Sequence, residues 1–185
     1  MIFLQHRCIF VHIPKCGGTS IRRALGDATE GLAHRTAAQQ INPETREFFN
    51  FSFVRNPWDR MVSYYAFKVR KGRLPADMGF TTFVQYLYEQ PQIFSHLPNL
   101  VRHIRPCTHW LNAEVDFVGR FEHLDRDFGI VCEKLGIAPI TLAVENSSSH
   151  APYQDYYDDL TRRRIEEQFR QDIQQFGYRF GEDLK

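Results

Sequence analysis

The segment CIFVHIPKCGGTSIRRALG constrains the fold more strongly than any other part of this sequence. It begins with a mostly apolar run, Cys8 to Ile13, which is typical of a strand covered on both faces. Pro14 ends the run. Thr19 and Ser20 are suitable N-cap residues, and the chain then continues as a helix that a glycine ends. A strand that passes through a short turn into a helix predicts an α/β architecture.

The turn between this strand and helix has the composition of an anion-binding site. Backbone N–H groups at a helix N-terminus point outward into a positive potential. Gly17 and Gly18 let the backbone approach a ligand closely and adopt a positive φ. Lys15 adds a full positive charge, and the Thr19 and Ser20 hydroxyls add donors. The turn therefore predicts a site for a phosphate or sulfate group.

The order of residues separates this turn from a nucleotide triphosphatase loop. That loop has the pattern GxxxxGK[ST], with the lysine after the last glycine and a hydroxyl on magnesium. Here Lys15 precedes Gly17, and the turn is shorter. It suits one or two anionic groups without a metal. An ordinary strand-to-helix turn with a solvated lysine is the alternative that the turn alone leaves open.

The rest of the chain alternates between strand and helix patterns. The opening residues 1–13 are expected to form a buried strand, and further strands are expected at Asn50–Val54 and Val115–Val118. Helices are expected after Asn56 and over Thr81–Tyr88, Leu124–Leu135 and Asp159–Gln175. This alternation predicts a three-layer α/β fold with a central parallel sheet and a P-loop-like strand–loop–helix, in a single domain over residues 1–185.

Composition excludes several classes of protein. A formal net charge of +1 does not indicate a nucleic-acid-binding protein, and no apolar run approaches the ~20 residues of a membrane span. The opening residues lack the features of a signal peptide, so we expect a cytoplasmic protein. The four cysteines are irregularly spaced, which favours reduced thiols. No second pair of ligands accompanies Cys8 with His12 or Cys107 with His109, so no metal site is expected.

A second polar stretch, FSFVRNPWDRMVSYY, follows the strand at Asn50–Val54. Arg55 leaves the end of that strand, and Asn56 with Pro57 forms a typical helix start. Ligands of open α/β sheets bind outside the carboxyl ends of the strands. If the two strands are neighbours, Lys15 and Arg55 can therefore bind one ligand that carries two anionic groups. A structural salt bridge for Arg55 is the alternative.

Together, the two stretches resemble the 5′-phosphosulfate and 3′-phosphate motifs of sulfotransferases that use 3′-phosphoadenosine 5′-phosphosulfate (PAPS). HIPKCGGTS is similar to the first motif and FVRNPWDRMVSYY to the second. The family includes the heparan sulfate 2-O and chondroitin 4-O carbohydrate sulfotransferases, and this chain resembles a short bacterial-like form. VDFVGRFEHLDRDF resembles a third block of that family, and HAPYQDYYD and DIQQFGYRF are also similar to it.

The resemblance implies an enzyme that moves a sulfuryl group from PAPS to a hydroxyl acceptor, in particular a carbohydrate. The residues that it implies for the 5′-phosphosulfate are Lys15, Cys16, Gly17, Gly18, Thr19 and Ser20. Arg55 and Ser63 would hold the 3′-phosphate, and a polar loop that includes Ser148 and Tyr153 would close over the nucleotide. Cys107 departs from the residue that relatives often carry, which puts the role of that position in doubt.

By analogy with phosphoryl transfer, Lys15 would stabilise charge on the leaving 5′-phosphate, and a general base would take the proton of the acceptor hydroxyl. His34 is the first candidate for this base, because the heparan sulfate 2-O enzymes are similar in placing a histidine between the two motifs. His103, His109 and Glu122 are the alternatives.

Two other functions remain open from the sequence. One is an ATP-dependent small-molecule kinase on a related fold, which would require magnesium. The other is a non-catalytic relative that binds a nucleotide or a glycan. The basic cluster at Arg70, Lys71 and Arg73 could contact an acidic saccharide, although a solvated surface cluster is the commoner meaning of such a run.

Overall fold

A computed structural model describes residues 1–26, 34–97, 99–142 and 151–182 of the chain. The chain folds into two compact units. The first, here called the sheet unit, takes its described residues from 1–55 and 107–142. The second, the helical unit, takes them from 56–106 and 151–182. That the whole chain forms a single domain stays a prediction.

The sheet unit contains a four-stranded sheet in the order β1-β2-β3-β4. The strands are β1 (Ile2–Phe3), β2 (Cys8–Val11), β3 (Phe49–Val54) and β4 (Phe117–Arg120). β2, β3 and β4 run parallel to one another, whereas β1 pairs with β2 in the antiparallel sense. The prediction of an α/β fold around a central sheet is confirmed, and the sheet is mostly parallel.

The opening of the chain differs from the single buried strand that its sequence predicts. A 3-10 turn, η1 (Leu4–His6), separates β1 from β2, and Arg7 follows it in the left-handed region with a φ of 47°. The chain therefore reverses at these polar residues, and residues 1–3 return along β2 as the sheet edge. The strand at β4 also lies two residues later than Val115–Val118.

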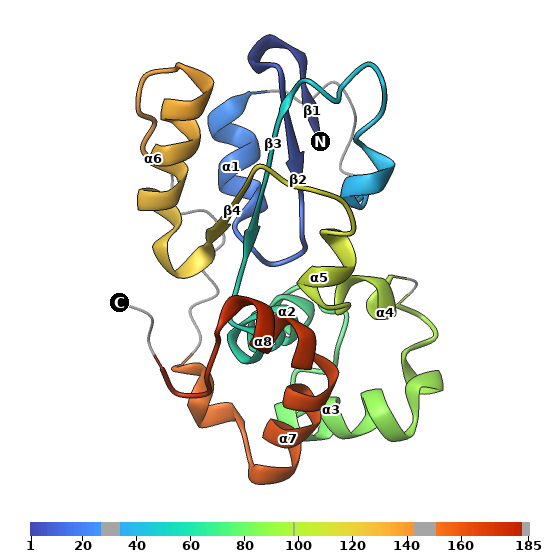
Figure 1. Ribbon diagram of the computed structural model, residues 1–185. Coiled ribbons are helices and arrows are strands. Elements are labelled where there is room, and N and C mark those ends of the chain that lie inside the picture. Colours follow the sequence, from blue (N-terminus) through green and yellow to red (C-terminus); the bar gives the residue numbers. More distant parts are fainter. Residues whose placement is uncertain (27–33, 98, 143–150, 183–185) are drawn as a thin grey trace. The chain divides into compact units, whose positions relative to one another are not determined.

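Helices cover both sides of this sheet. α1 (Gly18–Leu25) and α6 (Leu124–Leu135) lie on one side, and the 3-10 turn η2 (Ala37–Gln39) lies on the other (Figure 1). The sheet unit also contains α5 (Cys107–Trp110) and η4 (Phe121–His123). Gly136 ends α6 in the left-handed conformation, as predicted for a glycine C-cap.

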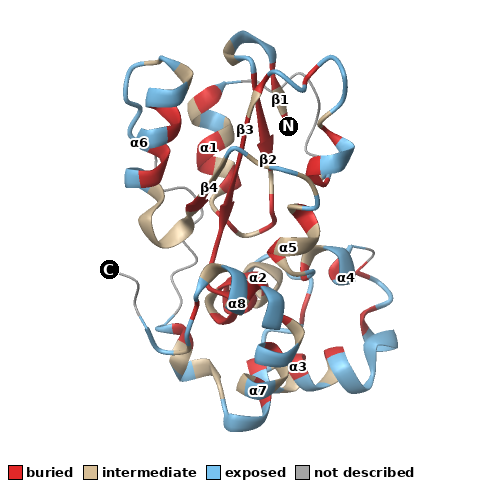
Figure 2. Ribbon diagram, viewed as in Figure 1, coloured by how far each residue is buried: buried red, intermediate tan, exposed pale blue. Residues whose placement is uncertain are grey.

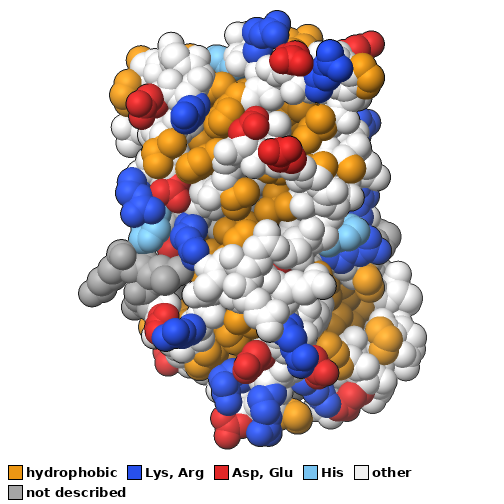
Figure 3. Space-filling model, in the orientation of Figure 1, with side chains coloured by type: hydrophobic (Ala, Val, Ile, Leu, Met, Phe, Trp, Pro, Cys, Tyr) orange, Lys and Arg blue, Asp and Glu red, His pale blue; other side chains and the backbone are white. Residues whose placement is uncertain are grey.

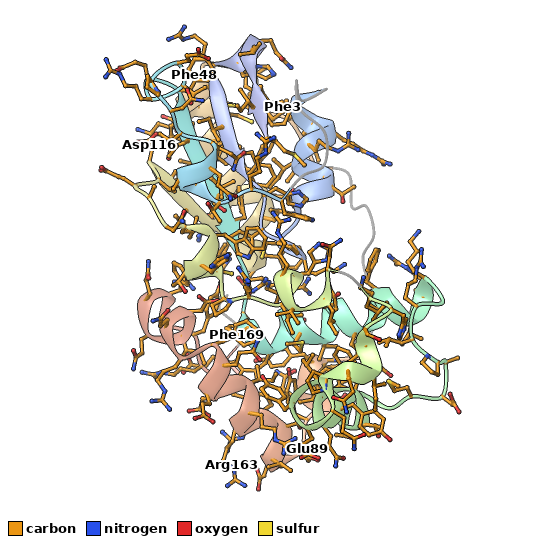
Figure 4. All side chains as sticks on the ribbon, turned by 90° about the vertical axis from the view of Figure 1, so that its right-hand side faces the viewer. Phe3, Phe48, Glu89, Asp116, Arg163 and Phe169 are labelled. Carbon is orange, nitrogen blue, oxygen red and sulfur yellow. The ribbon has the colours of Figure 1, made fainter. Side chains whose placement is uncertain are left out.

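The core of the sheet unit is aromatic. β2 is buried along its whole length and β3 along nearly all of it (Figure 2). Phe10 and Phe51 stack across these strands with ring centroids 5.2 Å apart. Asp116, labelled in Figure 4, accepts hydrogen bonds from the backbone and side chain of Asn50 at 2.8 and 2.9 Å. This bond ties the chain that enters β4 to the start of β3, and so helps to fix the register of the neighbouring strands.

The helical unit is built from α2 (Pro57–Arg70), α3 (Phe80–Glu89), η3 (Pro91–Phe94), α4 (Leu100–His103), η5 (Tyr153–Tyr156), α7 (Asp159–Gln168) and α8 (Arg170–Phe176). Asn56 caps α2, as predicted, because its side chain accepts hydrogen bonds from the N–H groups of Trp58 and Asp59. Within the unit, the Trp58 indole N–H donates to the carbonyl of Arg162 at 3.2 Å. Two short helical segments, η3 and α4, follow α3.

The single helix predicted over Asp159–Gln175 is wrong, because the chain breaks into α7 and α8 at Phe169. Phe169, labelled in Figure 4, has left the helical conformation and is buried at 2% exposure. Ile173 is only half-buried, although a straight helix would place it on the same apolar stripe. Burial of Phe169 therefore coincides with a change of helix direction that the apolar spacing does not encode.

Charged side chains of both signs are interspersed on the face drawn in Figure 3, in keeping with the formal net charge of +1. Among the described residues, no helix has both the length and the apolar character needed to cross a bilayer.

Candidate anion-binding site

The turn between β2 and α1 is built around backbone conformations that few side chains allow. Gly17 is the N-cap of α1 and lies in the left-handed region with a φ of 80°. A Cβ atom on Gly17 would also meet the methyl carbons of Leu124 at 3.0 Å. At Gly18, a Cβ atom would come within 2.0 Å of the His12 ring. The predicted positive φ is found at Gly17, and Gly18 allows close approach of the His12 ring. Close approach of the two glycines to a ligand stays a prediction.

Thr19 and Ser20 are not N-caps, because Gly17 takes that position without any side-chain hydrogen bond. Both residues lie in the first turn of α1. Within the described part of the chain, neither hydroxyl makes a hydrogen bond, and the N–H groups of Gly18 and Thr19 also have no acceptor there. This correction strengthens the anion-site prediction, since donors that a cap would use remain available to a ligand.

Arg55 lies beside this turn. It follows β3 directly, and β3 is the parallel neighbour of β2, so Lys15 and Arg55 leave the same edge of the sheet as predicted. The Arg55 side chain is buried, with 6% exposure. Its Nη1 donates a hydrogen bond to the carbonyl oxygen of Lys15 at 3.1 Å, and its Cζ lies 4.0 Å from the centre of the Phe121 ring.

His34 is held against the end of β2. Its Nδ1 lies 3.0 Å from the carbonyl oxygen of His12. Because a carbonyl oxygen only accepts, Nδ1 must carry the hydrogen, and Nε2 is then the basic nitrogen of the neutral ring. The His34 ring packs against His12 and the buried Trp110, with centroids 4.5 and 6.0 Å away. A histidine held as this tautomer can accept a proton at Nε2.

The other base candidates occupy separate places. His109 lies in α5, with its ring 5.5 Å from that of Trp110, and Glu122 lies in η4. His103 is the last residue of α4 in the helical unit, where its ring is 6.2 Å from that of Tyr64. The hydrogen bond to the His12 carbonyl, directly after β2, fixes the tautomer of His34.

The sequence also predicts three residues that would bind the rest of the nucleotide: Ser63, Ser148 and Tyr153. Ser63 lies in α2 of the helical unit with 2% exposure. The Tyr153 hydroxyl accepts a hydrogen bond from the N–H of Gly181 at 2.8 Å in the same unit. Ser148 lies outside the described residues. Their contribution to one ligand together with Lys15 stays a prediction.

All four cysteines are buried. Burial raises the pKa of the Cys8 thiol to about 12. Cys16, inside the turn, lies with its Sγ 3.7 Å from the Pro14 carbonyl oxygen and is 1% exposed. Cys107 is likewise buried at the start of α5. In the described ranges, no group of three or more His, Cys, Asp or Glu side chains could hold a metal ion.

Sequence reasoning misses two residues that the structure brings to this site. The sequence suggests His12 only as half of a metal pair, yet its carbonyl and ring hold His34 and abut Gly18. Phe121 stands out only as part of a family block, yet its ring faces both Arg55 and Gly17. Both lie next to a strand end, at Val11 and Arg120, which is the one signal that could have pointed to them.

The glycine-capped start of α1 and the basic residues Lys15 and Arg55 lie at one edge of the sheet, which is the arrangement expected of an anion site on an α/β fold. The sequence matches the model of the sulfotransferase family over residues 1–179, and the chain therefore belongs to that family. This confirms the predicted resemblance.

Several curated relatives are similar to this chain. Carbohydrate sulfotransferase 14 of Danio rerio is 25% identical, over 71% of this chain and 47% of its own length. Carbohydrate sulfotransferase 10 of Xenopus laevis is 22% identical, over 95% of this chain and 66% of its own length. The chain thus spans about half to two thirds of these relatives. A solved sulfotransferase from Alicyclobacillus acidocaldarius, 19% identical, aligns with 74% of this chain and 56% of its own at a TM-score of 0.43.

Proposed function

We propose that this protein transfers a sulfuryl group from PAPS to a hydroxyl group of a carbohydrate acceptor. The observation that carries the proposal is the β2–α1 turn, where donors of Gly18, Thr19 and Ser20 converge beside Lys15 in a member of the sulfotransferase family. A helix N-terminus with an adjacent lysine favours a group such as a phosphosulfate.

The proposed roles follow the position of each residue. The backbone of residues 16–20 and the hydroxyls of Thr19 and Ser20 would bind the 5′-phosphosulfate. A guanidinium group has five N–H donors, so the bond from Arg55 to the Lys15 carbonyl is compatible with a second contact to a 3′-phosphate. Ser63, Ser148 and Tyr153 are proposed to complete the nucleotide site.

Transfer would proceed as an in-line displacement. The acceptor oxygen bonds to sulfur as the bond from sulfur to the 5′-phosphate oxygen breaks, which releases adenosine 3′,5′-bisphosphate. Lys15 would stabilise the charge that develops on that leaving oxygen, and Nε2 of His34 would take the hydroxyl proton. The chain requires no metal in this scheme, because Lys15 and the helix N-terminus supply the positive charge.

The acceptor class is proposed from the names of the relatives, which are carbohydrate sulfotransferases. The cluster of Arg70, Lys71 and Arg73 gives no independent support. All three residues are exposed, as is usual for a solvated surface cluster.

The decisive experiment is incubation with sulfur-labelled PAPS and a panel of glycans and small hydroxyl compounds. We expect label in a glycan product without added metal. Binding of adenosine 3′,5′-bisphosphate with no transfer to any acceptor would favour the non-catalytic alternative. Transfer of phosphate from ATP that depends on magnesium would favour the kinase alternative.

Arg55 offers a test of the donor nucleotide. Arg55→Ala should weaken binding of adenosine 3′,5′-bisphosphate more than binding of adenosine 5′-monophosphate, which titration calorimetry can measure. Equal losses for both nucleotides would mean that Arg55 is not a ligand of the 3′-phosphate.

A further inference from the structure

The backbone of Lys15 adopts an unfavourable conformation. Lys15 has a φ of 68°, and among the described residues it shares a positive φ without being glycine with Arg7 alone. A side chain makes this conformation unfavourable, so it persists only where neighbouring structure holds it in place. The turn contributes one backbone hydrogen bond of its own, from the Cys16 N–H to the Ile13 carbonyl at 3.4 Å, and a contact from another segment adds to it.

Arg55 supplies a contact that holds this conformation. Its Nη1 reaches the carbonyl oxygen of Lys15 at 3.1 Å from the end of the neighbouring strand, forty positions later in the chain. A bond to the carbonyl fixes the peptide plane that follows Lys15. This bond is charge-assisted, because the donor is a guanidinium group, and such bonds are stronger than neutral ones.

Phe121 in turn orients Arg55. The guanidinium carbon lies 4.0 Å above the centre of the Phe121 ring, close enough for a stacked cation–π contact. The same ring also borders the turn, since a Cβ on Gly17 would lie 3.4 Å from Phe121 Cδ2. One aromatic side chain after β4 thus stacks on the arginine and lies close to the turn that the arginine bonds.

We propose that Phe121 is a positioning residue that holds the β2–α1 turn in order through Arg55. We call the Phe121 ring, the Arg55 guanidinium and the Lys15 carbonyl the Phe121 clamp. Phe121 touches no reacting group, and its effect is to keep the Arg55 plane where it bonds the turn. That the ordered turn serves sulfuryl transfer rests on the proposed function, but the clamp itself does not.

Cys16 provides a probe of the clamp that needs no nucleotide. Its thiol is 1% exposed and lies directly after Lys15, so iodoacetamide reaches it only when the turn opens. Cys8, on β2, is 0% exposed and reports opening of the strand itself. Alkylation of both residues can be followed in the intact protein by mass spectrometry of peptides after digestion.

Phe121→Leu should accelerate alkylation of Cys16 by about fivefold to tenfold, since a stacked cation–π contact and part of one hydrogen bond are lost. Alkylation of Cys8 should not change. Phe121→Tyr keeps the ring face and should restore the slow rate at Cys16. Phe117→Leu is the matched control, because Phe117 lies on β4 and its ring packs on Phe53 at 6.4 Å.

Two results would overturn the proposal. One is an unchanged Cys16 rate in Phe121→Leu. The other is a parallel rise at Cys8 and Cys16, which would mean that the substitution destabilises the whole sheet unit. If Phe121→Leu does not fold, Arg55→Lys gives the same test, because it keeps the charge and loses the planar group. Failure of the wild-type protein to transfer sulfate would refute the proposed function and leave the alkylation result intact.

Discussion

Two strand-to-helix turns leave the same edge of the sheet, and they treat their backbone donors in opposite ways. After β2, Gly17 caps α1 in the left-handed conformation and offers no side chain to the helix N–H groups. After β3, the Asn56 side chain accepts from the N–H groups of Trp58 and Asp59, and Pro57 has no N–H at all. The first turn therefore leaves its donors for a ligand, whereas the second uses them within the protein.

The difference teaches how each turn can contribute to a site. An anion at the first turn would meet backbone N–H groups, the Thr19 and Ser20 hydroxyls and the Lys15 side chain, and glycine at the cap keeps the N–H groups accessible. The second turn can contribute through its one long side chain, that of Arg55, which reaches the first turn at the carbonyl of Lys15.

The largest expected effect is at the first of these turns, between β2 and α1, which we call the open turn. Lys15→Ala should lower kcat by about 10²- to 10³-fold, the usual cost of removing one donor that stabilises transition-state charge. Circular dichroism and thermal unfolding should show a folded protein. Lys134→Ala, at the exposed end of α6, is the matched control and should keep full activity. Near-normal turnover of the Lys15 variant would remove this residue from the mechanism.

Next in size is the loss of the proposed base beside that turn. His34→Ala should lower transfer at neutral pH by about 10²-fold or more, because general base catalysis usually contributes at least that much. The control is His96→Ala, an exposed histidine whose ring bonds the Ile93 carbonyl. Unchanged transfer in the His34 variant would exclude it as the base, and His109→Ala would then be measured.

A pair of glycine substitutions tests why the open turn lacks side chains. Gly18→Ala should lower the free energy of unfolding by about 1–3 kcal/mol, because the new Cβ would overlap the His12 ring. Gly129→Ala, in the exposed part of α6 with nothing within 4 Å of its Cβ, should instead raise it by up to about 1 kcal/mol. Urea unfolding measures both, and the same sign for the two would contradict the close approach at Gly18.

The smallest expected effect concerns stability at the second turn, between β3 and α2, which we call the closed turn. Asn56→Ala should lower the free energy of unfolding by about 1 kcal/mol, because two N–H groups lose their acceptor. Thr19→Ala at the open turn removes a hydroxyl without a partner in the described residues. This substitution should change the free energy of unfolding by less than about 0.5 kcal/mol. Equal destabilisation by the two substitutions would contradict the conclusion that side-chain capping stabilises the second turn and not the first.

Much of the fold is local enough to be predicted from the sequence. The apolar run that becomes β2, the cap at Asn56 and the end of α6 at Gly136 each depend on residues a few positions apart. The break at Phe169 accompanies burial of that side chain, and the reversal at Arg7 uses a left-handed backbone at a residue that is not glycine. Apolar periodicity encodes neither feature.

The sequence by itself determined that a glycine turn with a lysine joins a buried strand to a helix, because apolar patterning and the φ freedom of glycine act over a few residues. Only the tertiary structure decided what supports that turn. The bond from Arg55 to the Lys15 carbonyl and the bond from His34 to the His12 carbonyl join residues 40 and 22 positions apart. The Phe121 ring comes from a third segment. The Arg55 and Phe121 contacts exist because β2, β3 and β4 lie side by side, and strand order is a property of the folded chain.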